Sequence, residues 1–219
     1  MPLQNRVTPE GDIIACEARG TMFGNRGGAL HTADRKLTSR RWKTKAWICC
    51  VLEFKGRHRV VMSPNRYTEL FFLDEATALA AGHRPCFECR RHDALRFAEA
   101  WRAAFELQRR PSAPEMDRRL QEERIRRGGG KVTYTSQLAG LPDGTFVRMG
   151  PRAYLLHAGR LLAWTPAGYA EVLAATRQQT VEVLTPRSIV AVLSARYRPK
   201  MHATAEAALG SPRNATPDY

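Results

Sequence analysis

The sequence predicts an α+β fold made of antiparallel hairpins, several packed helices and one tight Cys-x-x-Cys turn. Short apolar runs rich in β-forming residues, each bounded by turn residues, occur in both halves of the chain. In the middle, apolar residues recur at three- and four-residue steps, the spacing of amphipathic helices. The chain has 219 residues, of which 43% are apolar. This length suits one large domain or two small ones that share a face.

The N-terminal part predicts strands followed by a short helix. Residues 1–30 are rich in loop-forming residues and hold one or two short strands. Residues 46–54 are apolar, a turn follows at Lys55-Gly56-Arg57, and residues 58–62 are expected to return as the second strand of a hairpin. Residues 69–73 predict another strand. Asp74 is placed to cap a helix over residues 75–81, which Gly82 would end.

Two longer helices are predicted next. Asp93 is a second N-cap candidate. Apolar side chains follow it at helical spacing: Leu95, Ala98, Trp101 and Phe105. Residues 111–114 break this helix, and Ser112 and Glu115 have capping-box spacing for the next one. That second helix is highly charged, and its expected i,i+4 pairs are Glu122–Arg126 and Glu123–Arg127.

The run Gly128-Gly129-Gly130 is the best candidate for a boundary. We expect a basic part over residues 1–110, a charged helix and glycine linker over 111–130, and a small α+β part over 131–202. That last part predicts strands at 131–136 and 180–184, a hairpin of 152–157 with 160–164, and a helix over 186–195. Residues 203–219 are rich in Ala, Pro, Ser and Asn and predict a loose tail.

The charge balance points to a polyanionic partner. Thirty-five Lys and Arg face 21 acids, giving a formal net charge of +14. Such a surface attracts nucleic acid through counterion release, and we expect DNA. No apolar run is long enough for a membrane span, and the N-terminus lacks a signal core. Five cysteines, two of them adjacent, make a poor disulfide framework. These features favour a soluble, cytoplasmic protein with no membrane partner.

Basic residues cluster around one aromatic side chain at residues 35–45. A basic groove with an aromatic platform suits phosphate contact and base stacking. Trp42 lies inside the run, whereas Trp47 begins a predicted strand and is expected in the core. A solvated loop is the alternative. The residues expected to contact nucleic acid are Arg26, Arg35, Lys36, Arg40, Arg41, Trp42, Lys43, Arg84, Arg90 and Arg91.

The most specific motif is Cys86-Phe87-Glu88-Cys89. Two thiolates on such a turn can both face one Zn²⁺ at about 2.3 Å. Neighbouring arginines would favour the thiolate form. A redox pair would require a βαβ context that is absent here, and two buried thiols in a compact turn remain the structural alternative.

Residues 69–91, ELFFLDEATALAAGHRPCFECRR, resemble the second half of the Ada-type zinc-binding module of methylphosphotriester DNA repair proteins. The shared features are a short strand, an Ala-rich helix, a Gly-x-Arg-Pro segment and Cys-x-x-Cys. The resemblance covers about a tenth of the chain. It implies a zinc-knuckle-like turn and association with DNA. This chain has no upstream Cys-x-x-x-Cys, so the alkyl-accepting chemistry of the family is not implied.

For a further zinc ligand we favour Cys50. Adjacent residues on a strand point to opposite faces, so at most one of Cys49 and Cys50 can face a given site. The other is expected in the core. His92, three residues past Cys89, is an alternative ligand or an exposed residue at a helix start.

Three residues are candidates for a catalytic role. Asn25 and His31 lie in a glycine-rich segment whose amides could approach phosphate closely, and a plain turn is the alternative. Glu69 is a carboxylate near the Cys-x-x-Cys turn. The sequence contains no compact acidic cluster of the kind that holds Mg²⁺ in nucleases. We therefore expect a zinc-containing protein acting on damaged or modified DNA, with glycosylase-like base excision preferred. A non-catalytic nucleic-acid-binding regulator and a nuclease are the alternatives.

Overall fold

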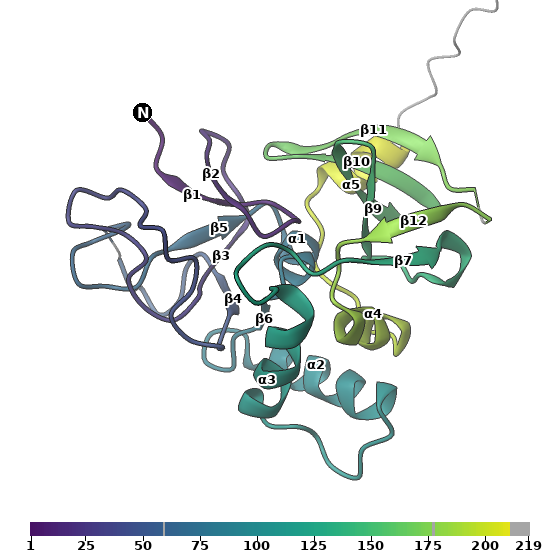
Figure 1. The fold of residues 1–219 in the computed structure, drawn as a ribbon, viewed down its shortest axis with the longest axis horizontal. Coiled ribbons are helices and arrows are strands. Elements are labelled where there is room, and N and C mark those ends of the chain that lie inside the picture. The colour runs from purple at the N-terminus through teal and green to yellow at the C-terminus, as the bar shows by residue number, and fades with distance from the viewer. Residues whose placement is uncertain (59, 177, 211–219) are drawn as a thin grey trace, which may run out of the picture.

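The computed structural model describes residues 1–58, 60–176 and 178–210. Within these residues the chain forms five α-helices and two six-stranded sheets, which confirms the α+β prediction. Figure 1 shows one sheet at each side of the molecule, with helices between and below them. No helix of the described part is both long and apolar enough to cross a membrane.

The first sheet is mixed and belongs to the N-terminal part. Its strand order is β2-β1-β5-β3-β4-β6, with parallel pairs at β1–β5 and β4–β6. The bounds are β1 Gln4–Val7, β2 Ile13–Ala15, β3 Met22–Asn25, β4 Ile48–Val51, β5 Leu70–Phe72 and β6 Arg84–Pro85. The expected hairpin of residues 46–54 with 58–62 is wrong. Strand β4 has β3 on one edge and β6 on the other, so neither edge is free for a returning strand.

The second sheet is antiparallel throughout, with the order β11-β10-β9-β8-β12-β7. Its bounds are β7 Tyr134–Gln137, β8 Phe146–Met149, β9 Arg152–His157, β10 Arg160–Thr165, β11 Gly168–Ala174 and β12 Thr180–Val183. The predicted hairpin around Ala158-Gly159 is confirmed, since β9 and β10 pair directly across it. Both of these turn residues have positive φ, the backbone conformation of tight two-residue hairpins.

The helices are α1 Glu75–Ala80, α2 Arg91–Ala104, α3 Ala113–Arg124, α4 Arg187–Ser194 and α5 Thr204–Gly210. Asp74 caps α1, and Ser112 with Glu115 forms the predicted capping box of α3. Asp93 lies in the first turn of α2 instead of capping it. Helix α5 occupies part of the segment expected to be a loose tail, and the rest, residues 211–219, lies outside the described residues.

Helix α3 is shorter than its charge pattern suggested. It ends at Arg124, with Ile125 in extended conformation. Arg126 and Arg127 therefore leave the helix axis, and the expected i,i+4 pairs do not form. The Glu123 carboxylate accepts hydrogen bonds from Ser188 at the start of α4 instead, at 2.7 Å from the backbone N and 2.6 Å from Oγ.

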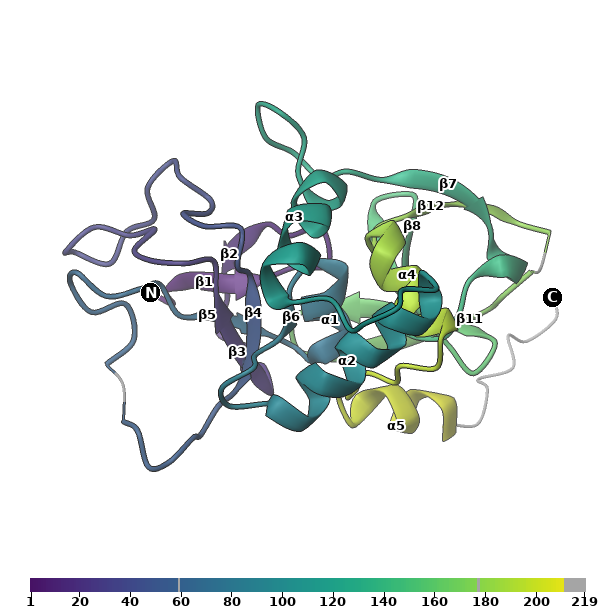
Figure 2. The same cartoon turned by 90° about the horizontal axis from the view of Figure 1, so that it is seen from below.

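Helix α1 joins the two sheets (Figures 1 and 2). Ala76 and Ala80 pack against the second sheet, whereas Ala78 and Ala81 pack against the first. Below this layer, α2, α3 and α4 share one core with Tyr197. The two halves of the sequence therefore do not have separate cores.

Two buried carboxylates at the start of α1 attach the C-terminal segment. The Tyr169 hydroxyl donates to Asp74 at 2.8 Å. The Tyr197 hydroxyl donates to Glu75 at 2.6 Å, and the backbone N of Lys200 donates to the same carboxylate at 2.9 Å. These bonds offset the cost of burying the carboxylates, so the last part of the chain completes the packing of α1.

Candidate metal centre and nucleic-acid interface

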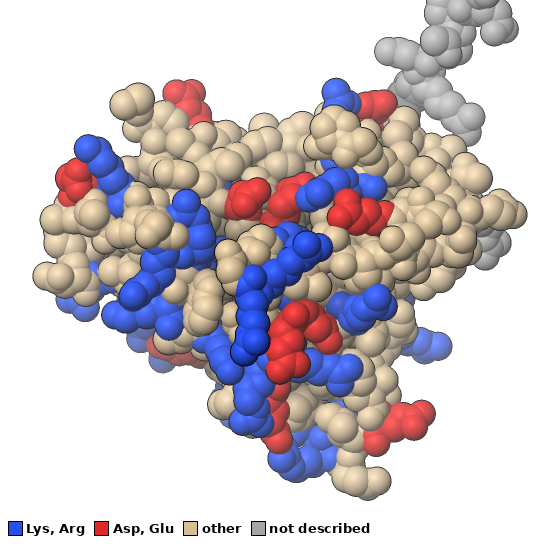
Figure 3. Space-filling view, viewed as in Figure 1, with Lys and Arg blue, Asp and Glu red and all other residues tan. Residues whose placement is uncertain are grey.

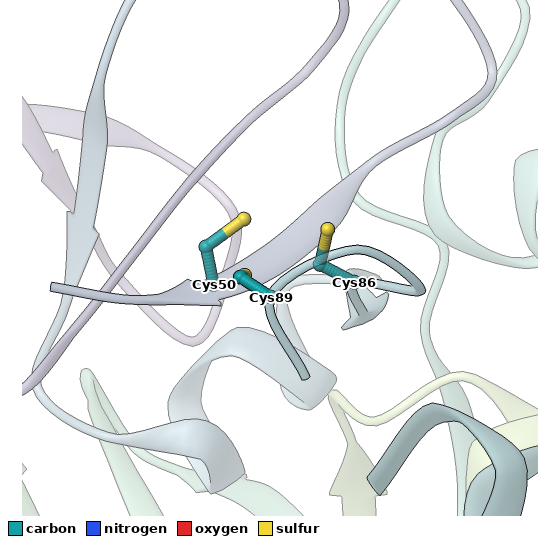
Figure 4. Close-up of side chains that lie close together, drawn as sticks. All are labelled: Cys50, Cys86 and Cys89. Carbon is teal, nitrogen blue, oxygen red and sulfur yellow. The ribbon is translucent and has the colours of Figure 1, made fainter. Parts of the chain in front are cut away.

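Three of the five cysteines lie together where β4, β6 and the start of α2 meet. The sulfur atoms of Cys50, Cys86 and Cys89 all lie within 4.8 Å of one another. Figure 4 shows the three side chains gathered beside β4. Cys50 and Cys86 are buried, and Cys89 is half-buried. In the described part of the chain, this Cys triad is the one group of three or more Cys, His or carboxylate side chains whose ligand atoms lie close enough to share a metal ion.

Backbone pairing places the Cys-x-x-Cys turn against β4. After α1, Gly82 has a φ of +88°, and a Cβ there would lie 2.7 Å from the Arg124 side chain. Glycine is thus needed where the chain turns into β6. The Cys86 amide then donates to the Cys49 carbonyl at 2.9 Å. Within the turn, the amide of Glu88 donates to the Cys86 sulfur at 3.4 Å.

The two adjacent cysteines of β4 point to opposite faces, as strand alternation predicts. Cys49 lies in the core with Leu70 and Phe72, and burial raises the pKa of its thiol. Cys50 packs on the other face, with Phe23 and Cys86. The expectation that one of the two faces the Cys-x-x-Cys turn is confirmed, and Cys50 is that residue.

The thiols of the Cys triad shift one another's pKa values through their mutual contacts. Hydrogen bonds from Cys50 and Cys89 hold the pKa of Cys86 well below its usual range. Hydrogen bonds with Cys86, and to a lesser extent with Cys89, raise the pKa of Cys50. A lowered pKa favours the thiolate form of Cys86, and thiolates are the donors that zinc and other thiophilic metals prefer. Two thiolates on one tetrahedral zinc lie about 3.8 Å apart, so the triad fits such an ion after small shifts. His92, the alternative ligand, is exposed and lies outside the triad.

The residues predicted to contact nucleic acid divide into an exposed and a buried set. Trp42 is half-buried. The exposed ones are Arg35, Lys36, Arg40, Arg41, Lys43 and Arg91. Figure 3 shows Lys and Arg side chains gathered over the N-terminal loops and around α3. Arg26, Arg84 and Arg90 are buried, which removes their guanidiniums from the surface where phosphate would bind.

The buried Arg84 and Arg90 hold the Cys-x-x-Cys turn to the helices. Arg84 makes a bidentate contact with Asp117 of α3, at 2.9 and 2.7 Å. Arg90 contacts Glu75 at 2.8 Å and Asp93 at 2.7 Å. Because these ion pairs are buried and hydrogen-bonded, they fix the position of the turn relative to α1 and α3.

Arg26 belongs to a buried stack around Trp47. Its guanidinium lies 4.0 Å from the ring centre, and that of Arg124 lies 3.9 Å from it. Burial lowers the pKa of both guanidiniums to about 9. Carbonyl oxygens accept from them: Gly11 from Arg26 and Gly82 from Arg124, each at 2.9 Å. Trp47 is a core residue, as expected, and the two arginines join α3 to the first sheet.

The three candidate catalytic residues bond within the fold. The Glu69 carboxylate accepts from the Met62 amide at 2.8 Å. His31 uses both ring nitrogens, with Nδ1 2.6 Å from the Thr68 hydroxyl and Nε2 3.1 Å from the Ser63 carbonyl. Asn25 Oδ1 accepts from the amide of Gly27, two residues on, at 3.0 Å. These contacts shape the loops at residues 25–31 and 62–69, and the catalytic roles stay a prediction.

A cleft of about 790 Å³ lies between the basic loop and the end of α3. Arg41 and Trp42 line one wall, and Ile125, Arg126 and Arg127 line the other. We call it the Trp42 cleft. Trp42 and Arg41 were among the predicted residues, but Arg126 and Arg127 were missed, because they were assigned to a helix and its ion pairs. The adjoining run of three glycines was the available signal that the helix ends before them.

Comparisons with protein-family models, with curated proteins and with solved structures find no match to this chain.

Proposed function

We propose that this chain is a zinc-containing nucleic-acid-binding protein that associates with DNA. The observation that carries the proposal is the Trp42 cleft, where three arginines and the half-buried ring of Trp42 converge from two distant parts of the sequence. Arginine suits bidentate phosphate contact and stacking on bases. The formal charge of +14 adds long-range attraction for a polyanion.

Zinc is the metal that best suits the Cys triad. Cys50, Cys86 and Cys89 would supply three thiolate ligands. The ion would link β4 to the start of α2 and so fix the basic face, which makes its role structural. The Ada-like spacing of residues 69–91 supports the same assignment, because that module holds zinc on a turn of this type.

Binding without base excision is the form of the proposal that the contacts favour. One carboxylate oxygen of Glu69, both ring nitrogens of His31 and Oδ1 of Asn25 bond to neighbouring backbone or hydroxyl groups. A general base must instead reach a substrate proton or a held water. Base excision stays a prediction, and duplexes carrying modified bases, treated with mild alkali after incubation, test it separately.

Two measurements test the proposed function. Metal analysis of the purified protein should find zinc in the wild type and in Cys16→Ser, a control outside the triad, but not in Cys86→Ser. Anisotropy of a labelled DNA should show binding at about 50 mM salt that weakens steeply by about 200 mM. A protein that holds no zinc refutes the metal assignment. One that binds neither duplex nor single strand at low salt refutes the DNA assignment.

A further inference from the structure

The Trp42 cleft has one wall that the sequence did not predict. Beyond α3, residues 125–131 form a tight loop, closed by a bridge between Ile125 and Lys131. The Arg126 amide donates to the Gly130 carbonyl and the Gly129 amide to the Arg126 carbonyl, both at 3.0 Å. These bonds hold the loop as a wall that carries two exposed arginines.

The charge of the cleft is unbalanced. Arg41, Arg126 and Arg127 line it, and none of them has an ion-pair partner among the described residues. Glu122 is the one acid in the lining. Some surface arginines pair with glutamates, such as Arg102 and Arg109, whereas the cleft gathers three that do not around one tryptophan. The cleft therefore presents guanidiniums without carboxylate partners to an anionic ligand, although Arg41 also donates to the Thr38 carbonyl.

Trp42 differs from Trp47 in what covers its ring. Two guanidiniums sandwich Trp47 in the core. Trp42 is half-buried in the cleft wall, and none of the ring or cation contacts found within the described ranges involves it. A half-buried indole ring that lines a cleft together with three arginines has the composition of a base-stacking platform.

We infer that the Trp42 cleft binds an unpaired nucleotide of single-stranded nucleic acid, with its base against Trp42 and its phosphates near the three arginines. This inference rests on the proposed function and specifies the strand state. The cleft volume lies within the range of about 300–1,000 Å³ typical of small-ligand sites, so it takes individual nucleotides. In a duplex the faces of the bases are already stacked on one another. The indole ring of Trp42 therefore cannot contact them unless a base first leaves the stack.

The test compares one sequence as a labelled single strand and as a duplex. The wild type should bind the single strand more tightly. Trp42→Ala should weaken single-strand binding by about 5- to 150-fold, the span that base stacking on an aromatic ring covers, and should leave duplex binding nearly unchanged. Trp42→Phe should retain most of the affinity, and melting curves check that both variants fold. Single strands of DNA and RNA, measured side by side, identify the preferred sugar.

A charge-matched control separates contacts within the cleft from the general attraction of a basic surface. Arg127→Ala in the cleft should weaken single-strand binding more than Arg19→Ala, which lies outside the cleft and the predicted interface, although each variant removes one exposed arginine. Equal affinities for single strand and duplex, unaffected by Trp42→Ala, overturn this inference and leave the proposed function standing. Loss of all nucleic-acid binding by the wild type overturns both.

Discussion

Replacing Asp117 by Ala should destabilise the fold strongly, because it leaves the Arg84 guanidinium buried without its counter-charge. The two side chains are only 5% and 6% exposed, and their closest oxygen and nitrogen lie 2.7 Å apart. Breaking a buried pair by removing one partner costs about 3–5 kcal/mol. For a chain of this length that corresponds to a melting temperature lower by roughly 6–20 °C.

Urea denaturation followed by circular dichroism measures this free energy of unfolding. Asp34→Ala is the matched control, since its ion pair with Lys36 is exposed and should contribute less than about 1 kcal/mol. The double variant Arg84→Met with Asp117→Leu should recover part of the loss, because no charge is then left buried alone. A loss of less than about 1 kcal/mol for Asp117→Ala, or a double variant no better than the single, refutes this reasoning.

Three further predictions concern the metal, one buried amine and one helix contact. A chelator should lower the melting temperature of the wild type and leave that of Cys86→Ser unchanged, because a metal stabilises only the fold that binds it; equal shifts contradict the metal site. Burial lowers the pKa of Lys131 to about 7, so the penalty for its charge is full below pH 7 and fades toward the unfolded pKa of about 10.4. Lys131→Met should therefore be more stable than the wild type at pH 7, and this difference in the free energy of unfolding should shrink as the pH rises to 10. Urea titrations across this range measure the difference, and a constant value would count against a buried charge. Glu123→Ala removes the acceptor of two Ser188 hydrogen bonds and should cost about 1–3 kcal/mol, whereas the exposed Glu122→Ala should cost less than about 0.5 kcal/mol.

Local signals in the sequence predicted the local structure well. The Asp74 cap, the Ser112–Glu115 capping box and the Ala158-Gly159 hairpin depend on residues within a few positions of one another. Strand alternation likewise separated Cys50 from Cys49. The Cys triad could be anticipated because two of its members share one turn and the third is constrained by the period of a strand.

Features that depend on distant pairing could not be predicted. Strand β4 pairs with β6, and the paired residues Ile48 and Arg84 are 36 positions apart in the sequence. Because β3 occupies the other edge of β4, no edge is left for the expected hairpin. Arg84 and Arg90 resemble exposed basic residues in sequence, but their partners on other elements make them internal. The second wall of the Trp42 cleft depends on where α3 ends, which its charge pattern obscured.

The contacts of Glu75 with Tyr197 and Lys200 also set an order of events during synthesis. Glu75 and Tyr197 are 122 residues apart in the sequence. At about 5–20 residues per second, the ribosome therefore adds Tyr197 roughly 6–24 s after Glu75. Throughout that interval α1 and α2 lack the apolar cover that α4 and Tyr197 provide. The nascent chain therefore exposes apolar surface during this interval. Its soluble expression should improve at a lower growth temperature or with chaperones that bind such surface.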